Sequence, residues 1–174
     1  FSVYHAAALI GASVLMAASR LLMRFLAAPS YFEAWHYAPV LILGTAVACL
    51  GSFFSSVYVA EKRSTATLVT SLIGAAANVI GNAVLIPVFG IMGAAVATFV
   101  SYIIIFVARA IHTQEFLKIQ WGVLRFVISM AILTAQCYLI ENRYTIWSWL
   151  CCAVIALLHI RPLFKAVKSG ALEM

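Results

Sequence analysis

The chain has 174 residues, of which 66% are hydrophobic and 9% are charged, and its formal net charge is +6. Soluble domains contain about 45–50% apolar and about 25% charged residues, so this composition excludes a soluble enzyme and a disordered chain. The apolar stretches are continuous and do not alternate with polar residues, which excludes an outer-membrane barrel. The sequence therefore predicts an all-α protein, a polytopic transmembrane helix bundle.

The length allows about six helical spans in a single bundle, with short connections and no water-soluble domain. The spans are expected at residues 1–18, 37–60, 66–86, 91–111, 121–140 and 145–160. An interfacial segment is expected at residues 20–36, and a basic tail at residues 161–174. The chain opens at Phe1 without a Met or a basic leader, which predicts a fragment of a longer chain.

The first span and its continuation carry one histidine and two arginines. Arg20 and Arg24 are four residues apart, so they share one face of a helix at the outer end of the span. Two interpretations are open for this pair, namely anchoring at the lipid headgroups or attraction of a pyrophosphate group. His5 lies near the inner end, where it is either a satisfied interfacial histidine or a group that titrates in a proton-coupled cycle.

One face of the third span is small or polar. On a wheel of 100° per residue, a sector of about 140° contains Thr67, Thr70, Ser71, Gly74, Ala75, Asn78, Gly81 and Asn82. In lipid, such a face predicts close contact between helices or the wall of a cavity. Asn78 and Asn82 are the most polar groups expected at depth. They either link neighbouring helices or line a hydrated cavity with Ser71 and bind sugar hydroxyls.

Small residues also follow one face of the second and fourth spans. These are Gly44, Ala48, Gly51 and Ser55 on the second span, and Gly90, Ala94, Ala97, Ser101 and Ala108 on the fourth. Pro87 and Gly90 mark an uncharged turn between the third and fourth spans. Three neighbouring helices with such faces predict a tightly packed bundle.

Lysine and arginine are unequally divided between the two alternating sets of connections. One set has seven and the other three: Lys62, Arg63, Arg109, Lys118, Arg161, Lys165 and Lys168 against Arg20, Arg24 and Arg143. Because cytoplasmic loops collect basic residues, both ends of the segment are expected in the cytoplasm. An aromatic belt at the membrane surfaces is expected from Trp35, Trp121, Trp147 and Trp149. Anionic lipid accounts for the net charge, so no nucleic-acid partner is expected.

Groups that carry catalysis are not expected within the membrane. The chain has no Asp, its five Glu lie at span ends, in loops or in the tail, and no nucleophile or phosphate-loop pattern is present. Cys49, Cys137, Cys151 and Cys152 lie in apolar stretches without the spacing or the histidine partners of a zinc site. We therefore expect no enzyme activity, no metal and no cofactor.

The segment from Lys62 to Tyr102 contains an extended motif. Ser71, Gly74, Asn78 and Asn82 precede the run LIPVFGIMGAAVAT at residues 85–98, and Ser101 and Tyr102 follow it. This motif resembles the C-terminal half of polysaccharide flippases in the multidrug, oligosaccharidyl-lipid and polysaccharide exporter superfamily. The approach to the second span, with Tyr31, Glu33, Ala34 and Pro39, is similar as well.

The resemblance implies a transporter with two bundles of six helices around a central cavity. Such flippases move undecaprenyl-pyrophosphate-linked oligosaccharides across the bacterial inner membrane by alternating access, for O-antigen, lipopolysaccharide or capsule synthesis. This chain would then be one lobe, and its partners would be the missing N-terminal lobe, membrane lipids and the lipid-linked oligosaccharide. On physical grounds the motif is expected to be a helix-packing device, formed by Pro87, Gly90, Gly93, Ala94, Ala97 and Ser101.

Physical arguments alone make Arg20, Arg24, Ser71, Asn78 and Asn82 candidates for the substrate cavity, because no family role transfers to them. Two other functions stay open. A multidrug or cation-coupled exporter of the same superfamily should carry a buried carboxylate. A non-transporting scaffold subunit would need no hydrated cavity.

Overall fold

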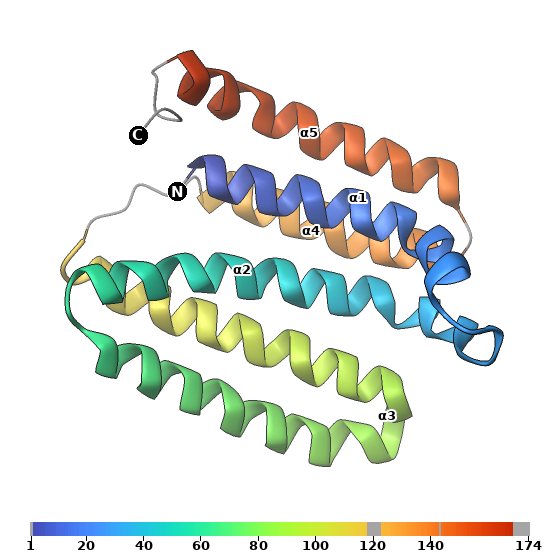
Figure 1. The fold of residues 1–174 in the computed structure, drawn as a ribbon, viewed down its shortest axis with the longest axis horizontal. Helices are drawn as coiled ribbons and strands as arrows, with labels where there is room; N and C mark the ends of the chain where they lie inside the picture. The colour runs from blue at the N-terminus through green and yellow to red at the C-terminus, as the bar shows by residue number, and fades with distance from the viewer. Residues whose placement is uncertain (1, 118–122, 143, 169–174) are drawn as a thin grey trace. The chain divides into compact units, whose positions relative to one another are not determined.

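A computed structural model describes residues 2–117, 123–142 and 144–168, and these residues contain helices and no strand. The elements in chain order are α1 (Ser2–Leu26), the 3-10 helix η1 (Pro29–His36), α2 (Ala38–Ala60), α3 (Ser64–Gln114), α4 (Val123–Glu141) and α5 (Thr145–Lys168), as Figure 1 shows. The prediction of an all-α bundle of the transmembrane type is confirmed.

Four of the described helices, α1 to α4, are long and apolar enough to cross a membrane. A shorter apolar helix, Ile146–Ile160, forms the first part of α5. The chain is therefore a multi-pass membrane protein. Lys118, Trp121 and Arg143, which entered the predicted loop charges and aromatic belt, lie outside the described residues, as do residues 169–174 of the predicted tail.

Helix α3 turns back on itself at Gly90, whose backbone is not helical. A straight helix of its 51 residues would be about 76 Å long, more than twice the roughly 30 Å of a hydrocarbon core. The turn divides α3 into a first arm (residues 64–89) and a second arm (residues 91–114), which lie side by side in Figure 1. Each arm contains one of the spans predicted at residues 66–86 and 91–111.

The structure contains two compact units. Unit 1 contains Phe1–Pro39 and Trp121–Met174, and unit 2 contains Val40–Gln120. Unit 1 is therefore built from α1, η1, α4 and α5, and unit 2 from α2 and the two arms of α3.

In unit 1, α1 runs parallel to α4 and antiparallel to α5. The ring of His5 lies 5.8 Å from that of Phe126 on α4, and Ser13 bonds to Gln136 further along both helices. On α5 the order is reversed, because Ser13 contacts Cys152 while His5 lies beside the later His159. The beginning of α1 and the end of α5 therefore lie at the same end of unit 1.

Helix α1 is longer than the predicted first span and takes up part of the expected interfacial segment. It continues to Leu26, so Arg20 and Arg24 lie on its last two turns. Ala28 has an extended backbone (φ −62°, ψ 151°), as expected for a residue before proline, and η1 begins at Pro29.

In unit 2, α2 packs along the second arm of α3 through the small-residue face predicted for the second span. A Cβ atom added to Gly44 would lie 3.4 Å from the Cα of Phe99, and one added to Gly51 would lie 3.9 Å from the Cα of Phe106. One turn further along α2, the rings of Phe54 and Phe106 are 5.8 Å apart. The two helices are parallel, because residues later in α2 contact residues later in the second arm.

Candidate functional sites

The turn of α3 contains two glycines that no other residue replaces without strain. Gly90 has φ 56° and ψ −135°, a backbone region that is readily open only to glycine. A Cβ atom on Gly93 would lie 2.6 Å from the carbonyl carbon of Leu85 and 3.0 Å from the amide nitrogen of Ile86. Pro87 stands in the last turn of the first arm, where it removes one helical N–H donor.

Beyond the turn, the two arms of α3 meet through small residues. A Cβ atom on Gly81 would lie 3.1 Å from the Cβ of Ala97. Gly74 faces the side chain of Ile105 and, at 3.6 Å from its added Cβ, the carbonyl oxygen of Ser101. Ala97 and Ser101 are both buried. The absence of larger side chains here lets the arms approach closely.

Four polar side chains form a ladder between the two arms: Asn82, Asn78, Thr98 and Ser101. The Nδ2 of Asn82 donates to the Oδ1 of Asn78 (3.0 Å), and the Nδ2 of Asn78 donates to Thr98 Oγ1 (3.3 Å) and Ser101 Oγ (3.4 Å). The two hydroxyls donate in turn to backbone carbonyls of Ala94 (2.9 Å) and Thr98 (2.8 Å). We call these four side chains the polar ladder.

The polar ladder ends at a buried acceptor. Asn82 Oδ1 has no hydrogen-bond partner among the described residues. The other amide, Asn78, accepts one hydrogen bond on its oxygen from Asn82 and makes two long bonds from its nitrogen. The ladder therefore connects the arms and also leaves one acceptor for a hydroxyl or amide donor that is not part of it.

Ser71, the third candidate on the first arm, does not join the polar ladder. Its hydroxyl accepts from the Nη2 of Arg109 (2.9 Å), and the same guanidinium donates from Nε to Thr70 Oγ1 (3.0 Å) and from Nη1 to the carbonyl oxygen of Gly51 (3.0 Å). Arg109 is only 7% exposed. It therefore connects α2 with both arms of α3.

The sequence places Arg109 among the loop charges, so its role as a link between helices was missed. The described residues contain no carboxylate within ion-pair distance of it. One signal was present: Thr70 and Ser71 lie in the polar sector of the third span, and Gly51 on the small-residue face of the second. Arg109 lies at the matching depth on the fourth span, because Arg109 and Ser71 are separated by equal numbers of residues from the turn at Gly90.

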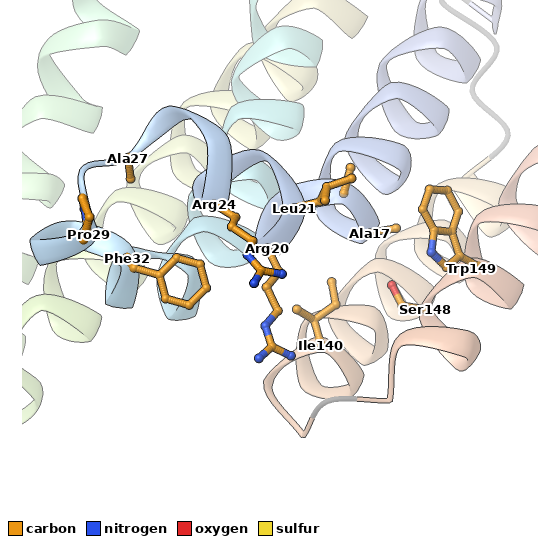
Figure 2. A pocket seen from close by; sticks show the side chains of 11 residues that line it. Ala17, Arg20, Leu21, Arg24, Ala27, Pro29, Phe32, Ile140, Ser148 and Trp149 are labelled. Carbon is orange, nitrogen blue, oxygen red and sulfur yellow. The ribbon is translucent and has the colours of Figure 1, made fainter.

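Unit 1 contains a cavity of about 900 Å³ at the end where α1 stops. It is lined by Ala17, Ala18, Arg20, Leu21, Arg24, Ala27, Pro29, Phe32, Ile140, Ser148 and Trp149. Figure 2 shows the side chains of Arg20 and Arg24 extending from α1 to one side, near Phe32 and Ile140. The two arginines predicted to share a face thus share one cavity, which we call the basic cavity.

The guanidinium groups of the basic cavity are not neutralised by carboxylates among the described residues. The Cζ of Arg20 lies 5.0 Å from the ring centroid of Trp35, a cation–π contact that fixes its position. Neither arginine has a carboxylate oxygen within 4.0 Å in the described part of the chain. Glu141, at the end of α4, is bonded instead to His36 Nδ1 (2.8 Å).

Gln136 is the centre of a second buried polar cluster, in unit 1. Its Nε2 donates to the carbonyl oxygen of Ser13 (2.9 Å) and to Ser148 Oγ (3.2 Å), and its Oε1 accepts from the Ser13 hydroxyl (2.7 Å). Gln136, Ser13 and Ser148 are fully buried. The cluster therefore ties α4 to α1 and α5. It was missed because its partners lie far away in the sequence; the one signal was a glutamine inside an apolar span.

The remaining candidates from the sequence are His5 and the cysteines. The rings of His5 and His159 are 5.1 Å apart. Within the ranges that the structure describes, no three or more His, Cys, Asp or Glu side chains are grouped to hold a metal ion. The cysteines contribute small side chains, and Cys152 contacts the hydroxyl of Ser13 (3.1 Å).

Comparison with known proteins identifies no relative. No protein-family model matches the chain, and no curated protein or solved structure matches it either. The fold and the polar sites are therefore described from the structure of this chain alone.

Proposed function

We propose that the chain is part of a transporter that flips undecaprenyl-pyrophosphate-linked oligosaccharides across the bacterial inner membrane for polysaccharide or O-antigen synthesis. The observation that carries this proposal is the polar ladder, which lies within two apolar arms of a multi-pass protein. The resemblance of residues 62–102 to polysaccharide flippases supports the same function.

The polar ladder suits a ligand that offers many hydroxyl groups. A buried acceptor without a partner is unfavourable in an apolar medium, and the buried Oδ1 of Asn82 is such an acceptor. A sugar hydroxyl can donate to that oxygen and accept from an amide N–H. If the ladder only joined the two arms, Asn78 would be sufficient, because it alone reaches Thr98 and Ser101.

The proposed orientation places the beginning of α1 and the end of α5 on the cytoplasmic side, since six basic residues besides the buried Arg109 belong to the connections of that side and three to the others. Transport would then proceed by rocking of this lobe against the N-terminal lobe. The four glutamates that the structure describes, Glu33, Glu61, Glu115 and Glu141, are all exposed. A cation-coupled exporter would instead use a carboxylate at depth.

The test uses the full-length protein in cells that lack their own flippase. We expect Asn82→Leu to lower polysaccharide export roughly tenfold, because sugar hydroxyls would lose a buried hydrogen-bond partner. The control is Ala83→Leu, which adds a similar side chain at the neighbouring exposed position.

Thiol labelling separates a transporter from a scaffold. Asn82→Cys should react with a water-soluble reagent in one access state, whereas Val79→Cys, on the exposed apolar face, should not react in either. Normal export by Asn82→Leu, together with an unreactive thiol at position 82 in both states, would refute the transport role of the ladder.

A further inference from the structure

The basic cavity of unit 1 has a location and a composition that the proposed transport does not require. It lies where α1 ends and η1 begins, between the end of α4 and the beginning of α5. Trp147 and Trp149 stand on the first turns of α5 and are both exposed. Because exposed tryptophans concentrate at the headgroup level of a bilayer, the cavity is expected at the depth of the lipid phosphates.

The positive charge of the basic cavity favours an anionic ligand. Arg20 and Arg24 add two positive charges, and Ser148 is the one other polar residue of its lining among the described residues. The dipole of α1 favours one cation in its last turn, which accounts for Arg24. It does not account for two guanidinium groups that reach the same space (Figure 2).

Guanidinium groups select a phosphate by geometry as well as by charge. Their planar N–H groups form paired hydrogen bonds to phosphate oxygens. Arg20 is held against Trp35, so less freedom is lost when it binds. Arg24 has no hydrogen-bond or ion-pair partner among the described residues, so its donors are available to the same anion.

The other walls of the basic cavity are apolar. Leu21, Phe32, Ile140 and Trp149 surround the space next to the arginines. A small soluble anion would leave these side chains in contact with water, whereas a lipid would cover them with its glycerol backbone and first acyl carbons. A volume of about 900 Å³ is sufficient for a headgroup and these carbons, since ligand sites range over about 300–1,000 Å³.

We propose that the basic cavity binds the phosphate headgroup of an anionic membrane phospholipid. Arg20 and Arg24 hold the phosphate, and the apolar walls hold the adjoining part of the lipid. The proposed lipid binding does not depend on the proposed flipping, and the two can fail separately, because the binding experiment does not measure transport.

The experiment titrates the 174-residue chain, purified in a neutral detergent, with phosphatidylglycerol, phosphatidylcholine or inorganic pyrophosphate, and counts bound molecules by native mass spectrometry. We expect saturable binding of one phosphatidylglycerol, and weaker binding of the other two. Because each arginine provides a charge-assisted hydrogen bond, the double variant Arg20→Gln, Arg24→Gln should lose at least about tenfold in affinity.

A matched control removes two arginines elsewhere. Arg63→Gln with Arg125→Gln also removes two positive charges. Both residues lie away from the basic cavity, because Arg63 stacks on Phe116 in unit 2 and Arg125 lies near the beginning of α4. This control should bind phosphatidylglycerol like the unchanged chain. An equal loss in the control would overturn the proposal, because general electrostatic attraction would then be sufficient.

Two further results decide the kind of ligand. Equal binding of phosphatidylcholine and phosphatidylglycerol would show that the site does not select an anionic lipid. Pyrophosphate that binds as tightly as phosphatidylglycerol would show a phosphate site without a lipid.

If the glutamine variant does not fold, Arg20→Lys with Arg24→Lys keeps both charges, and it should still bind phosphatidylglycerol severalfold more weakly because lysine lacks the planar fork. Unchanged affinity in that variant would also count against the proposal.

Discussion

Replacing Gly93 by alanine tests how closely the two arms of α3 approach at their turn. The new Cβ would lie 2.6 Å from the carbonyl carbon of Leu85 and 3.0 Å from the nitrogen of Ile86. Non-bonded carbons normally stay about 3.5–4.0 Å apart. Because the obstructing atoms belong to the backbone, no side chain can rotate away, and we expect the second arm to move outward by about 1 Å.

The energetic cost follows from this movement. Adding a methyl group to a well-packed site costs about 1–3 kcal/mol. The polar ladder weakens as well, because the 3.3 Å and 3.4 Å bonds of Asn78 across the arms exceed hydrogen-bond distance after such a shift. Each such bond in a membrane protein contributes on average about 0.6 kcal/mol. The higher helix propensity of alanine offsets up to about 1 kcal/mol of this cost, so we expect the free energy of unfolding to fall by about 1–3 kcal/mol.

The measurement is reversible unfolding in mixed micelles, with Gly11→Ala as the control. Gly11 is in the middle of α1, and a Cβ there would meet nothing within 4 Å. This variant should be neutral or more stable by up to about 1 kcal/mol. Equal stability of the two variants would contradict the close approach of the arms.

Three other variants test the turn and the two buried clusters by the same unfolding measurement. Gly90→Ala should cost about 1–3 kcal/mol although space is open there, and Gly90→Asn should not rescue it, because ψ −135° lies outside the left-handed helical region that asparagine tolerates. Ser71→Ala should cost about 1.5–3 kcal/mol by leaving one N–H of buried Arg109 unpaired, and no loss would contradict that bond. Gln136→Leu should cost about 1–3 kcal/mol, and adding Ser13→Ala should restore part of it; a further loss would contradict the proposed hydrogen bonding.

The features predicted best from the sequence depend on short-range patterns. Hydropathy predicts the helices, and Pro87 with Gly90 predicts where α3 reverses. The four-residue spacing of Asn78 and Asn82 predicts that they share a face, and the structure shows them bonded to each other. Arg20 and Arg24 share a cavity for the same reason. Each of these relationships spans one or two helical turns, which fixed helix geometry determines.

The features that the sequence did not reveal depend on contacts between distant helices. Arg109 counts as a loop charge until Thr70, Ser71 and Gly51 are placed around it. Hydropathy also does not indicate which spans pack together within a unit, because each apolar span is suitable for either unit. Such contacts follow from how faces pair in three dimensions, and six apolar helices allow many pairings.

The order of the helices along the chain has a consequence for biosynthesis. Unit 2 is a continuous stretch, so its helices can associate as soon as they leave the ribosome and enter the bilayer. Unit 1 is divided in the sequence by unit 2. Ser13 on α1 can therefore contact Gln136 and Cys152 only after α4 and α5 have been synthesised. During that interval the inner face of α1 is turned toward lipid or an insertion factor. Translation that stops after α3 would therefore release a first helix without its partners α4 and α5, although all the helices of unit 2 had been made.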